Sequence, residues 1–267
     1  MRPIEEPKVY LVAKTMLEPD GLNAYLRDIG NPDWKPDPGV SNAENLVEAA
    51  GRMCYRSWQP YDPAKPEATN PNVTTVRQGN DAYIGNVLKS GHGSVLEHAC
   101  LTFICRNVSR VFTHELVRHR AGMAYSQESL RYVRLDDIPF WMPGSARANE
   151  TARKKIEEVV DFLENTQKEL SAIFGMADLT DFTAKKQLTS MFRRVAPIGL
   201  GTTIMVTGNL RSWRHIIEMR TSPHAEEEIR IVTGKIAEIC KAHFPNVFQD
   251  MAFDQVQGSW TFGHTKV

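Results

Sequence analysis

Short runs of alternating apolar and polar residues predict three strands. Residues 8–15 place Val9, Leu11 and Val12 around Tyr10, which is the pattern of a strand. A compact apolar run predicts a second strand over 101–105, and strict alternation predicts a third over 202–207. Three strands spread this widely are too few for a doubly wound sheet.

Helical periodicity covers more of the chain than strand alternation. Ser41 and Glu44 form a capping-box pattern, in which a Ser and a Glu three residues apart satisfy backbone donors at a helix start. Ser222-Pro223 places a capping residue before a proline, which predicts another helix start. The predicted helices span 41–54, 76–89, a segment from 109, 149–174, 181–194 and a segment after 222.

These elements predict a mixed α+β fold. We expect one domain, residues 1–267, in which several helices pack on a small, mainly antiparallel sheet. The long helical segment at about 146–190 resembles an insertion, and residues from about 245 to 267 form a tail with no evident role. No internal repeat or low-complexity tract divides the chain.

Composition places the chain among ordinary globular proteins. Lys and Arg total 32, as do Asp and Glu, and 42% of residues are hydrophobic. No apolar run reaches the roughly 20 residues of a membrane helix, and the first residues lack an apolar signal region. The cysteines form no CxxC pair, so we expect reduced, buried thiols in a cytoplasmic protein and no metal site; they are Cys54, Cys100, Cys105 and Cys240.

Basic side chains concentrate between residues 118 and 131, although the whole chain has no net charge. Arg118, His119 and Arg120 are consecutive, and Ser129 and Arg131 follow closely. The flanks add Arg106, Arg110 and Arg134, against the two acids Glu115 and Glu128. Guanidinium groups converging with hydroxyls suit a phosphorylated small molecule. A domain that binds nucleic acid usually carries a larger excess of positive charge.

Two histidine-containing segments have alternative interpretations. His92, Ser94, Glu97 and His98 follow a predicted helix end at Gly91, and Ser94 with Glu97 also matches a capping box. The segment 114–119 superficially resembles a zinc-protease helix. Its histidines are five residues apart rather than four, so they do not share a helix face, and we reject a metal site there.

A last polar segment follows the third predicted strand. It contains Asn209, Arg211, His215 and Arg220. A helix with a polar face would explain part of this pattern. We place Arg220 just before a helix start, where an anionic ligand would be stabilised.

Taken together, these motifs resemble the flavin-dependent thymidylate synthases. Arg118-His119-Arg120, then eight residues, then Ser129 is similar to the signature of that family. The resemblance extends in family order over about residues 91–229 and includes the segment 45–58. Its further motifs are Gly91-His92-Gly93-Ser94 through Glu97-His98, Arg193 before Pro197, Asn209-Leu210-Arg211-Ser212, His215, Arg220 and His224-Ala225.

This resemblance implies an enzyme that converts dUMP to dTMP. Methylenetetrahydrofolate would supply the carbon, and NADPH would reduce a bound FAD. It also implies a homotetramer with active sites between subunits, so that Arg193 would serve a neighbouring subunit. No cysteine is needed as a nucleophile, and Ser129 has no adjacent base, so we assign it to binding.

The same resemblance implies residue roles. Arg220 would activate the uracil ring. The residues implied for dUMP are Glu115, Arg118, Gln127, Ser129, Leu130, Arg131, Arg193 and Arg220. Those implied for FAD are His92, Ser94, Arg118, His119, Arg120, Gln127, Asn209, Arg211 and His215. Glu115 stands where some relatives have Gln, and a carboxylate there would repel a phosphate unless an Arg pairs with it.

Two other functions stay open from the sequence. A non-catalytic nucleotide- or RNA-binding protein could use the same arginine cluster, and it would carry no flavin. A flavin-dependent uridine methyltransferase acting on RNA would need a basic surface beyond the pocket, which the zero net charge argues against.

Overall fold

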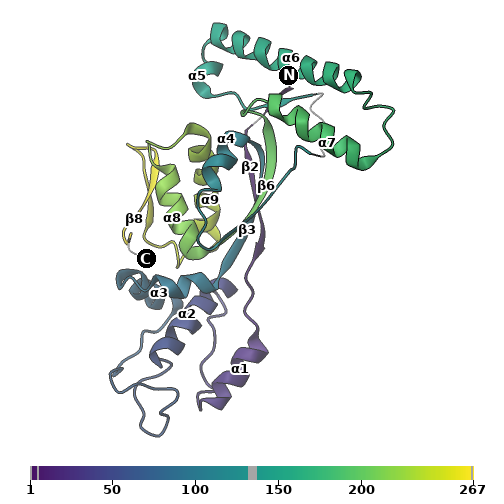
Figure 1. The fold of residues 1–267 in the computed structure, drawn as a ribbon. Helices are drawn as coiled ribbons and strands as arrows, with labels where there is room; N and C mark the ends of the chain where they lie inside the picture. Colours follow the sequence, from purple (N-terminus) through teal and green to yellow (C-terminus); the bar gives the residue numbers. More distant parts are fainter. Residues whose placement is uncertain (1, 5, 132–136, 266) are drawn as a thin grey trace.

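A four-stranded antiparallel sheet lies at the centre of the computed structural model, which describes residues 2–4, 6–131, 137–265 and 267 (Figure 1). The strand order is β2-β3-β6-β4. The strands are β2 (Lys8–Lys14), β3 (Cys100–Ser109), β4 (Met123–Gln127) and β6 (Gly201–Asn209). Arg134 of the basic cluster and Tyr132, which follows Arg131, lie outside the described residues.

One face of this sheet is covered by α4 (Arg110–Leu116), α8 (Leu210–Thr221) and α9 (Glu227–His243) (Figure 1). Alternate residues of β3 point into this core, and Leu101, Phe103 and Cys105 are fully buried. The ring of Phe103 packs edge-on against Trp213 of α8 with centroids 5.0 Å apart. The opposite face carries exposed apolar side chains, among them Tyr10, Val12 and Met205.

The first third of the chain packs at one end of the sheet. It contains α1 (Pro19–Asp28), α2 (Asn42–Tyr55), α3 (Asn80–Lys89) and the short 3₁₀ helix η1 (Gly93–His98). The predicted helix start at Ser41 is confirmed, because Ser41 Oγ accepts from Glu44 N at 3.3 Å. The carboxylate of Glu44 accepts from Ser41 Oγ at 2.7 Å, whereas in a capping box it accepts from the backbone N–H of the capping residue. The other oxygen of Glu44 accepts from the backbone N–H of Asn246, so α2 is tied to the C-terminal segment.

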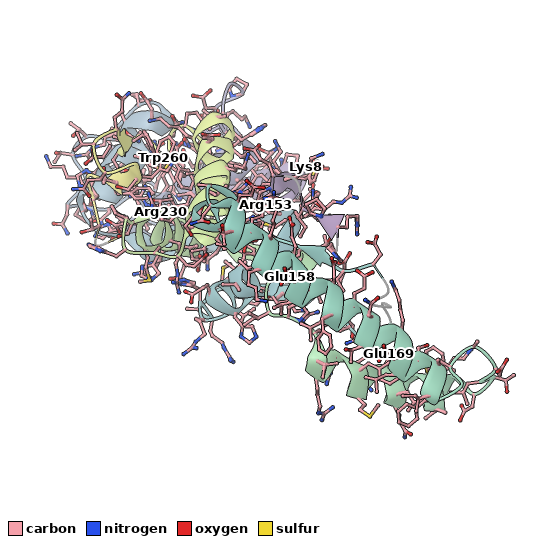
Figure 2. The ribbon with its side chains drawn as sticks, turned by 90° about the horizontal axis from the view of Figure 1, so that it is seen from above. Lys8, Arg153, Glu158, Glu169, Arg230 and Trp260 are labelled. Atoms are coloured by element: carbon pink, nitrogen blue, oxygen red, sulfur yellow. The ribbon has the colours of Figure 1, made fainter. Side chains whose placement is uncertain are left out.

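A helical hairpin extends from the other end of the sheet. It consists of α5 (Gly144–Arg147), α6 (Glu150–Ile173), α7 (Phe182–Phe192) and the 3₁₀ turn η2 (Arg193–Val195). Figure 2 shows α6 running away from the body, with Glu169 near its far end. A small cluster of Ile138, Val160 and Leu200 anchors the hairpin at its base.

Two short strand pairs complete the fold. β1 (Arg2–Pro3) pairs in parallel with β5 (Pro139–Phe140), and β7 (Met251–Asp254) forms a hairpin with β8 (Ser259–Phe262). The turn before β7 is fixed by Asp250, whose carboxylate binds Arg214 of α8 at 2.7 Å. Both side chains of this pair are almost fully buried, so Asp250 ties the start of this strand pair to the core.

Three expectations about helix starts and burial are wrong. The helix predicted over 76–89 begins at Asn80, because Gly79 has a φ of +83°, which ends helical geometry. Ser222 ends α8 rather than opening a helix; α9 begins at Glu227 and is capped by the carboxylate of Glu226. Cys54 is exposed, although it was expected to be buried.

The mixed α+β class and the antiparallel sheet are confirmed, and the described residues form a single domain. Within the described residues no helix is both long and apolar enough to cross a membrane. The same part of the chain holds no group of three or more His, Cys, Asp and Glu side chains that could bind a metal ion.

Candidate functional site

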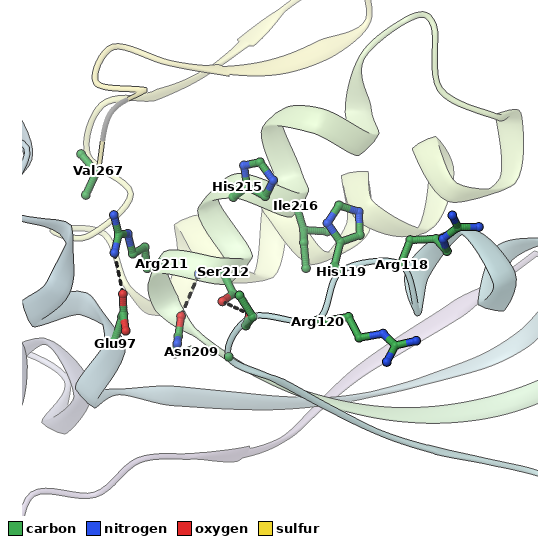
Figure 3. A pocket seen from close by; sticks show the side chains of 12 residues that line it. Glu97, Arg118, His119, Arg120, Asn209, Arg211, Ser212, His215, Ile216 and Val267 are labelled. Atoms are coloured by element: carbon green, nitrogen blue, oxygen red, sulfur yellow. Dashed lines mark hydrogen bonds and ion pairs between the residues drawn. The ribbon is translucent and has the colours of Figure 1, made fainter.

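A pocket of about 460 Å³ lies between the turn that follows α4 and the first half of α8 (Figure 3). Its lining is mostly cationic and polar. The lining residues are Glu97, Arg118, His119, Arg120, Ala121, Gly122, Asn209, Arg211, Ser212, His215, Ile216 and Val267. Six of them belong to the set that the sequence assigned to a flavin: Arg118, His119, Arg120, Asn209, Arg211 and His215.

The turn from Val117 to Gly122 is held by hydrogen bonds on its inner side. The backbone N–H of His119 donates to Leu116 O at 3.1 Å, and Tyr125 Oη donates to His119 O at 2.5 Å. Burial raises the pKa of Tyr125 to about 12, so its hydroxyl keeps the proton that makes this bond. Arg118 and Arg120 are exposed on either side of His119.

The start of α8 is joined directly to this turn. Asn209 caps the helix, since its Oδ1 accepts from Ser212 N at 2.8 Å, and its own N–H donates to Gly122 O at 3.2 Å. Ser212 Oγ donates to Ala121 O at 2.7 Å. Gly122 has a φ of +68°, and a Cβ there would meet Asn209 Nδ2 at 2.2 Å. Only glycine permits this close approach.

Arg220 lies in the last turn of α8, four residues after Ile216 and therefore on the same face of the helix as that lining residue. Its Nη1 donates to Glu115 Oε2 at 2.6 Å, and its Nε donates to His119 Nε2 at 2.8 Å. The expectation that Arg220 precedes a helix start is therefore wrong. It ends a helix, where the helix dipole stabilises a cation.

His119 is neutral in this network. Burial, together with the positive charges of Arg220 and His215, lowers its pKa to about 4, although Glu115 opposes the shift. Its Nε2 accepts from Arg220, which requires the neutral ring. The rings of His119 and His215 lie edge to face with centroids 5.9 Å apart.

Glu97 closes the other end of the pocket by binding Arg211, with Oε1 and Nη1 2.5 Å apart. Figure 3 shows this pair beside Val267. The alternative capping box does not form, because η1 has no side-chain cap and Glu97 faces Arg211 instead. Gly93 lies against both Val267 and Arg211. A Cβ at this position would meet the Val267 carbonyl carbon at 2.5 Å and Arg211 Nε at 2.8 Å.

The remaining predicted residues lie outside this pocket. His92 stacks on Tyr55 with ring centroids 5.2 Å apart, and Ser94 is exposed on η1. Gln127 donates to Thr113 Oγ1 at 3.2 Å, at the end of β4 away from Gly122.

The predicted phosphate ligands also lie past this end of β4. Ser129 Oγ accepts from Arg131 N at 3.3 Å, and Leu130 packs on the hairpin base. Arg193 begins η2. Burial lowers the pKa of the Arg110 guanidinium, and the positive charge of nearby Arg193 lowers it further. In one chain these residues and the pocket are therefore separate.

Several lining residues were not predicted. Ser212 stands inside the Asn209–Ser212 motif, and Gly122 is the only glycine between Arg120 and Ser129. The sequence could therefore have indicated both residues. Val267 carried none, because it comes from the tail and reaches the pocket only through tertiary packing.

The pocket presents cationic and polar side chains between the turn that follows α4 and the first half of α8. The model of the family described as thymidylate synthase complementing protein matches residues 39–246. The chain belongs to this family.

Similar proteins carry a more specific name. The chain is 36% identical over 221 residues to a flavin-dependent thymidylate synthase of Corynebacterium diphtheriae, covering 82% of each protein. It is 39% identical over 248 residues to the protein of that name in Mycobacterium tuberculosis, covering 91% of this chain and 89% of the relative. A third relative of that name, in Mycobacteroides abscessus, is 36% identical over 260 residues.

Proposed function

We propose that this protein is a flavin-dependent thymidylate synthase. It methylates dUMP to dTMP, with methylenetetrahydrofolate as the carbon donor and NADPH as the reductant of FAD. One observation carries the proposal. Arg220 is fixed by Glu115 and His119 beside a pocket built from the Arg118–Arg120 and Asn209–Ser212 motifs. Membership of the family supports the same reaction.

The pocket residues fit a flavin dinucleotide. Arg118, Arg120 and Arg211 offer guanidinium groups for a diphosphate, and Asn209, His119 and His215 add polar groups around an apolar contact at Ile216. A volume of about 460 Å³ lies within the range of cofactor pockets. His92 and Ser94 would extend this site past Gly93. When bound, FAD supplies the hydride for the reaction.

Arg220 is the residue that we assign to activation of the uracil. Uracil is a weak nucleophile at C5, and a cation beside N3 and a carbonyl oxygen favours the electron-rich, anionic ring. Glu115 and His119 fix the guanidinium in one orientation by accepting two of its donors. A pre-oriented cation stabilises developing charge without reorganising during the reaction. Arg118 and Gln127 complete the set proposed around the pyrimidine.

The phosphate of dUMP would be bound by Ser129, Arg131 and Arg193, with Leu130 as a packing contact. These residues lie past the end of β4, away from the pocket of the same chain. That separation supports a homotetramer in which one subunit completes the site of its neighbour. Exposed Tyr10, Val12 and Met205 on the open sheet face support contact with a second copy.

The remaining parts of the proposal concern organisation and location. Residues 146–190 are a helical insertion in a single domain of residues 1–267, and residues 245–267 are a variable tail whose last residue lines the pocket. Four free cysteines support a reducing, cytoplasmic location. Zero net charge supports small-molecule substrates rather than nucleic acid.

The decisive experiment is an absorption spectrum of the purified protein, followed by anaerobic NADPH with and without dUMP. We expect flavin bands near roughly 370 and 450 nm that bleach faster when dUMP is present. Formation of dTMP after methylenetetrahydrofolate is added completes the test. A protein that stays colourless after FAD is supplied would overturn the proposal and favour a plain anion-binding surface.

A further inference from the structure

A second polar pocket, of about 510 Å³, lies where β2, β3 and β6 meet near the N-terminus. It shares no lining residue with the pocket of the candidate site. The lining residues that matter here are Lys8, Arg106, Asn107, Glu128 and Thr203. We refer to it as the β-bulge pocket.

Two cations lie side by side on neighbouring strands in this pocket. Lys8 of β2 is directly opposite Arg106 of β3 in the strand register. Like charges directly opposite on neighbouring strands destabilise a sheet. Among the residues that the structure describes, neither side chain has a carboxylate within ion-pairing distance. The pair therefore concentrates positive charge for which the described residues provide no ion pair.

The backbone at Arg106 is irregular in a way that turns side chains toward the pocket. The pairing of β3 with β6 passes from Cys105–Ile204 to Val108–Thr202, so Arg106 and Asn107 together oppose Thr203. Asn107 has a φ of +59°, which asparagine tolerates better than most residues. Such β-bulges re-aim side chains and recur beside binding sites.

The one lining carboxylate among the described residues, that of Glu128, forms no ion pair with these cations. Glu128 Oε2 accepts from Thr203 N at 2.9 Å, and Glu128 N donates to Thr203 O at 3.0 Å. The carboxylate keeps its charge, but one of its oxygens is directed at the strand opposite the bulge. Arg2, which also lines the pocket, is balanced by Asp137 at 3.0 Å.

We propose that the β-bulge pocket binds a phosphate monoester. Lys8 and Arg106 match the two charges of the phosphate, and Asn107 and Thr203 provide neutral hydrogen-bond donors beside them. The volume leaves room for a sugar-sized group attached to the phosphate. This site lies outside the residues proposed for dUMP, although Glu128 stands between Gln127 and Ser129 in the chain.

The test is calorimetric titration of the full-length protein with inorganic phosphate and with ribose 5-phosphate. It is done at constant ionic strength with saturating dUMP, which fills the proposed substrate site. We expect one phosphate site per chain that weakens at least about tenfold in Arg106→Gln and Lys8→Gln, because each loses a charge-assisted contact. Lys14→Gln, an exposed β2 lysine that does not line the pocket, is the matched control and should bind like the parent.

Thermal unfolding adds a readout that folding defects would not reproduce. In chloride buffer the unfolding temperature of Arg106→Gln should be no lower than that of the parent, because the substitution removes a charge repulsion. Added phosphate should raise the unfolding temperature of the parent by more than that of Arg106→Gln. Equal phosphate affinity in the parent and Arg106→Gln, or an equal loss in Lys14→Gln, would overturn the proposal.

The same titrations separate this proposal from the proposed function. Arg193→Gln should weaken dUMP binding and leave the β-bulge pocket unchanged. If the protein binds neither flavin nor dUMP, phosphate binding that depends on Arg106 still supports the second site. Tighter binding of ribose 5-phosphate than of phosphate assigns the site to a phosphorylated organic molecule, and equal binding assigns it to free phosphate.

Discussion

The Arg220 guanidinium binds the Glu115 carboxylate across 2.6 Å, although the two residues are 105 positions apart in the chain. Arg220 is mostly buried and Glu115 is partly open, with side-chain exposures of 17% and 40%. From the sequence, Glu115 was a charge that would repel a phosphate unless an arginine paired with it. The structure supplies that arginine, and it is the residue proposed to activate the substrate.

This pairing predicts graded effects at position 115. Glu115→Gln keeps an oxygen that can accept from Arg220 but loses the charge, so kcat should fall about tenfold, in line with a charge-assisted bond worth about 1.5–3 kcal/mol. Glu115→Ala removes both and should lower kcat further. Arg220→Ala should abolish turnover while the flavin absorbance persists. Steady-state kinetics with flavin content measured on each variant checks this, and unchanged turnover in Glu115→Ala would contradict the assigned role.

His119 predicts a pH dependence of stability. Its pKa is about 4 in the folded protein against an ordinary value of 6.5, so the unfolded chain binds the proton more readily. The contribution of His119 to the free energy of unfolding is therefore present above pH 6.5 and is lost as the pH falls toward 4.

Urea unfolding at a series of pH values tests this expectation. His119→Gln keeps a side-chain oxygen that can accept from Arg220 but does not titrate, so its stability should fall less between pH 6.5 and 4 than that of the parent. The difference between the two curves isolates His119 from other titrating groups. Parallel curves would show that the histidine does not contribute.

The sequence predicted the helices and the antiparallel sheet well where periodicity or a cap was strong. Ser41 and Ser109 begin helices as expected, and the long helix over 149–174 is α6. Strand β4 was not predicted, because its five residues follow a basic turn and alternate weakly between half-buried and exposed positions. Ser222-Pro223 misled because proline also commonly follows a helix end.

The sequence motifs predicted which segments form the candidate site, but they did not predict the contacts between its residues. Residues 118–120 and 209–215 meet in one pocket as the resemblance implied. The bond between Arg220 and His119 depends on how the end of α8 lies against the turn that follows α4, which no local pattern encodes. The same holds for Val267, which reaches the pocket through the packing of the tail.

Gly122 should be intolerant of a side chain. Gly122→Ala places a Cβ 2.2 Å from Asn209 Nδ2 and 2.7 Å from Ser212 Oγ, so the turn must move away from α8. We expect the variant to lose FAD on gel filtration and to be destabilised by more than the roughly 1–2 kcal/mol of a left-handed alanine. Gly175→Ala is the matched control, because its φ of +57° is similar and its Cβ meets nothing within 4 Å. Equal losses in the two variants would refute the contact with Asn209.

The cysteines should be dispensable for catalysis. Burial raises the pKa of Cys105 to about 12 and also raises that of Cys240, whereas Cys54 is exposed. A thiol reagent should therefore modify Cys54 in the folded protein, and mass spectrometry should find Cys105 and Cys240 unmodified. Turnover should persist in the modified protein and in Cys54→Ser. Loss of activity in both would point to a thiol in the reaction.

Glu228 provides a last prediction, since it supports the start of α4, the helix that carries Glu115. It is fully buried; its Oε1 accepts from Ser109 N at 2.5 Å, and its other oxygen binds Ser109 Oγ, which itself caps α4. Burial raises the pKa of this carboxyl to about 7, against an ordinary value of 4.5. Between these values the unfolded chain ionises first, so stability falls as the pH rises from 4.5 to 7.

Glu228→Gln imitates the protonated carboxyl, because its oxygen accepts from Ser109 N and its amide donates to Ser109 Oγ. We expect near-parental stability at pH 4.5 and a smaller decline toward pH 7. Glu228→Ala leaves the Ser109 N–H buried without a partner and should cost about 1–3 kcal/mol at every pH. Chemical denaturation of the parent, Glu228→Gln and Glu228→Ala across this pH range measures these differences in the free energy of unfolding. If Glu228→Gln is as unstable as Glu228→Ala, the carboxyl is ionised in the folded protein and its charge holds α4 in place.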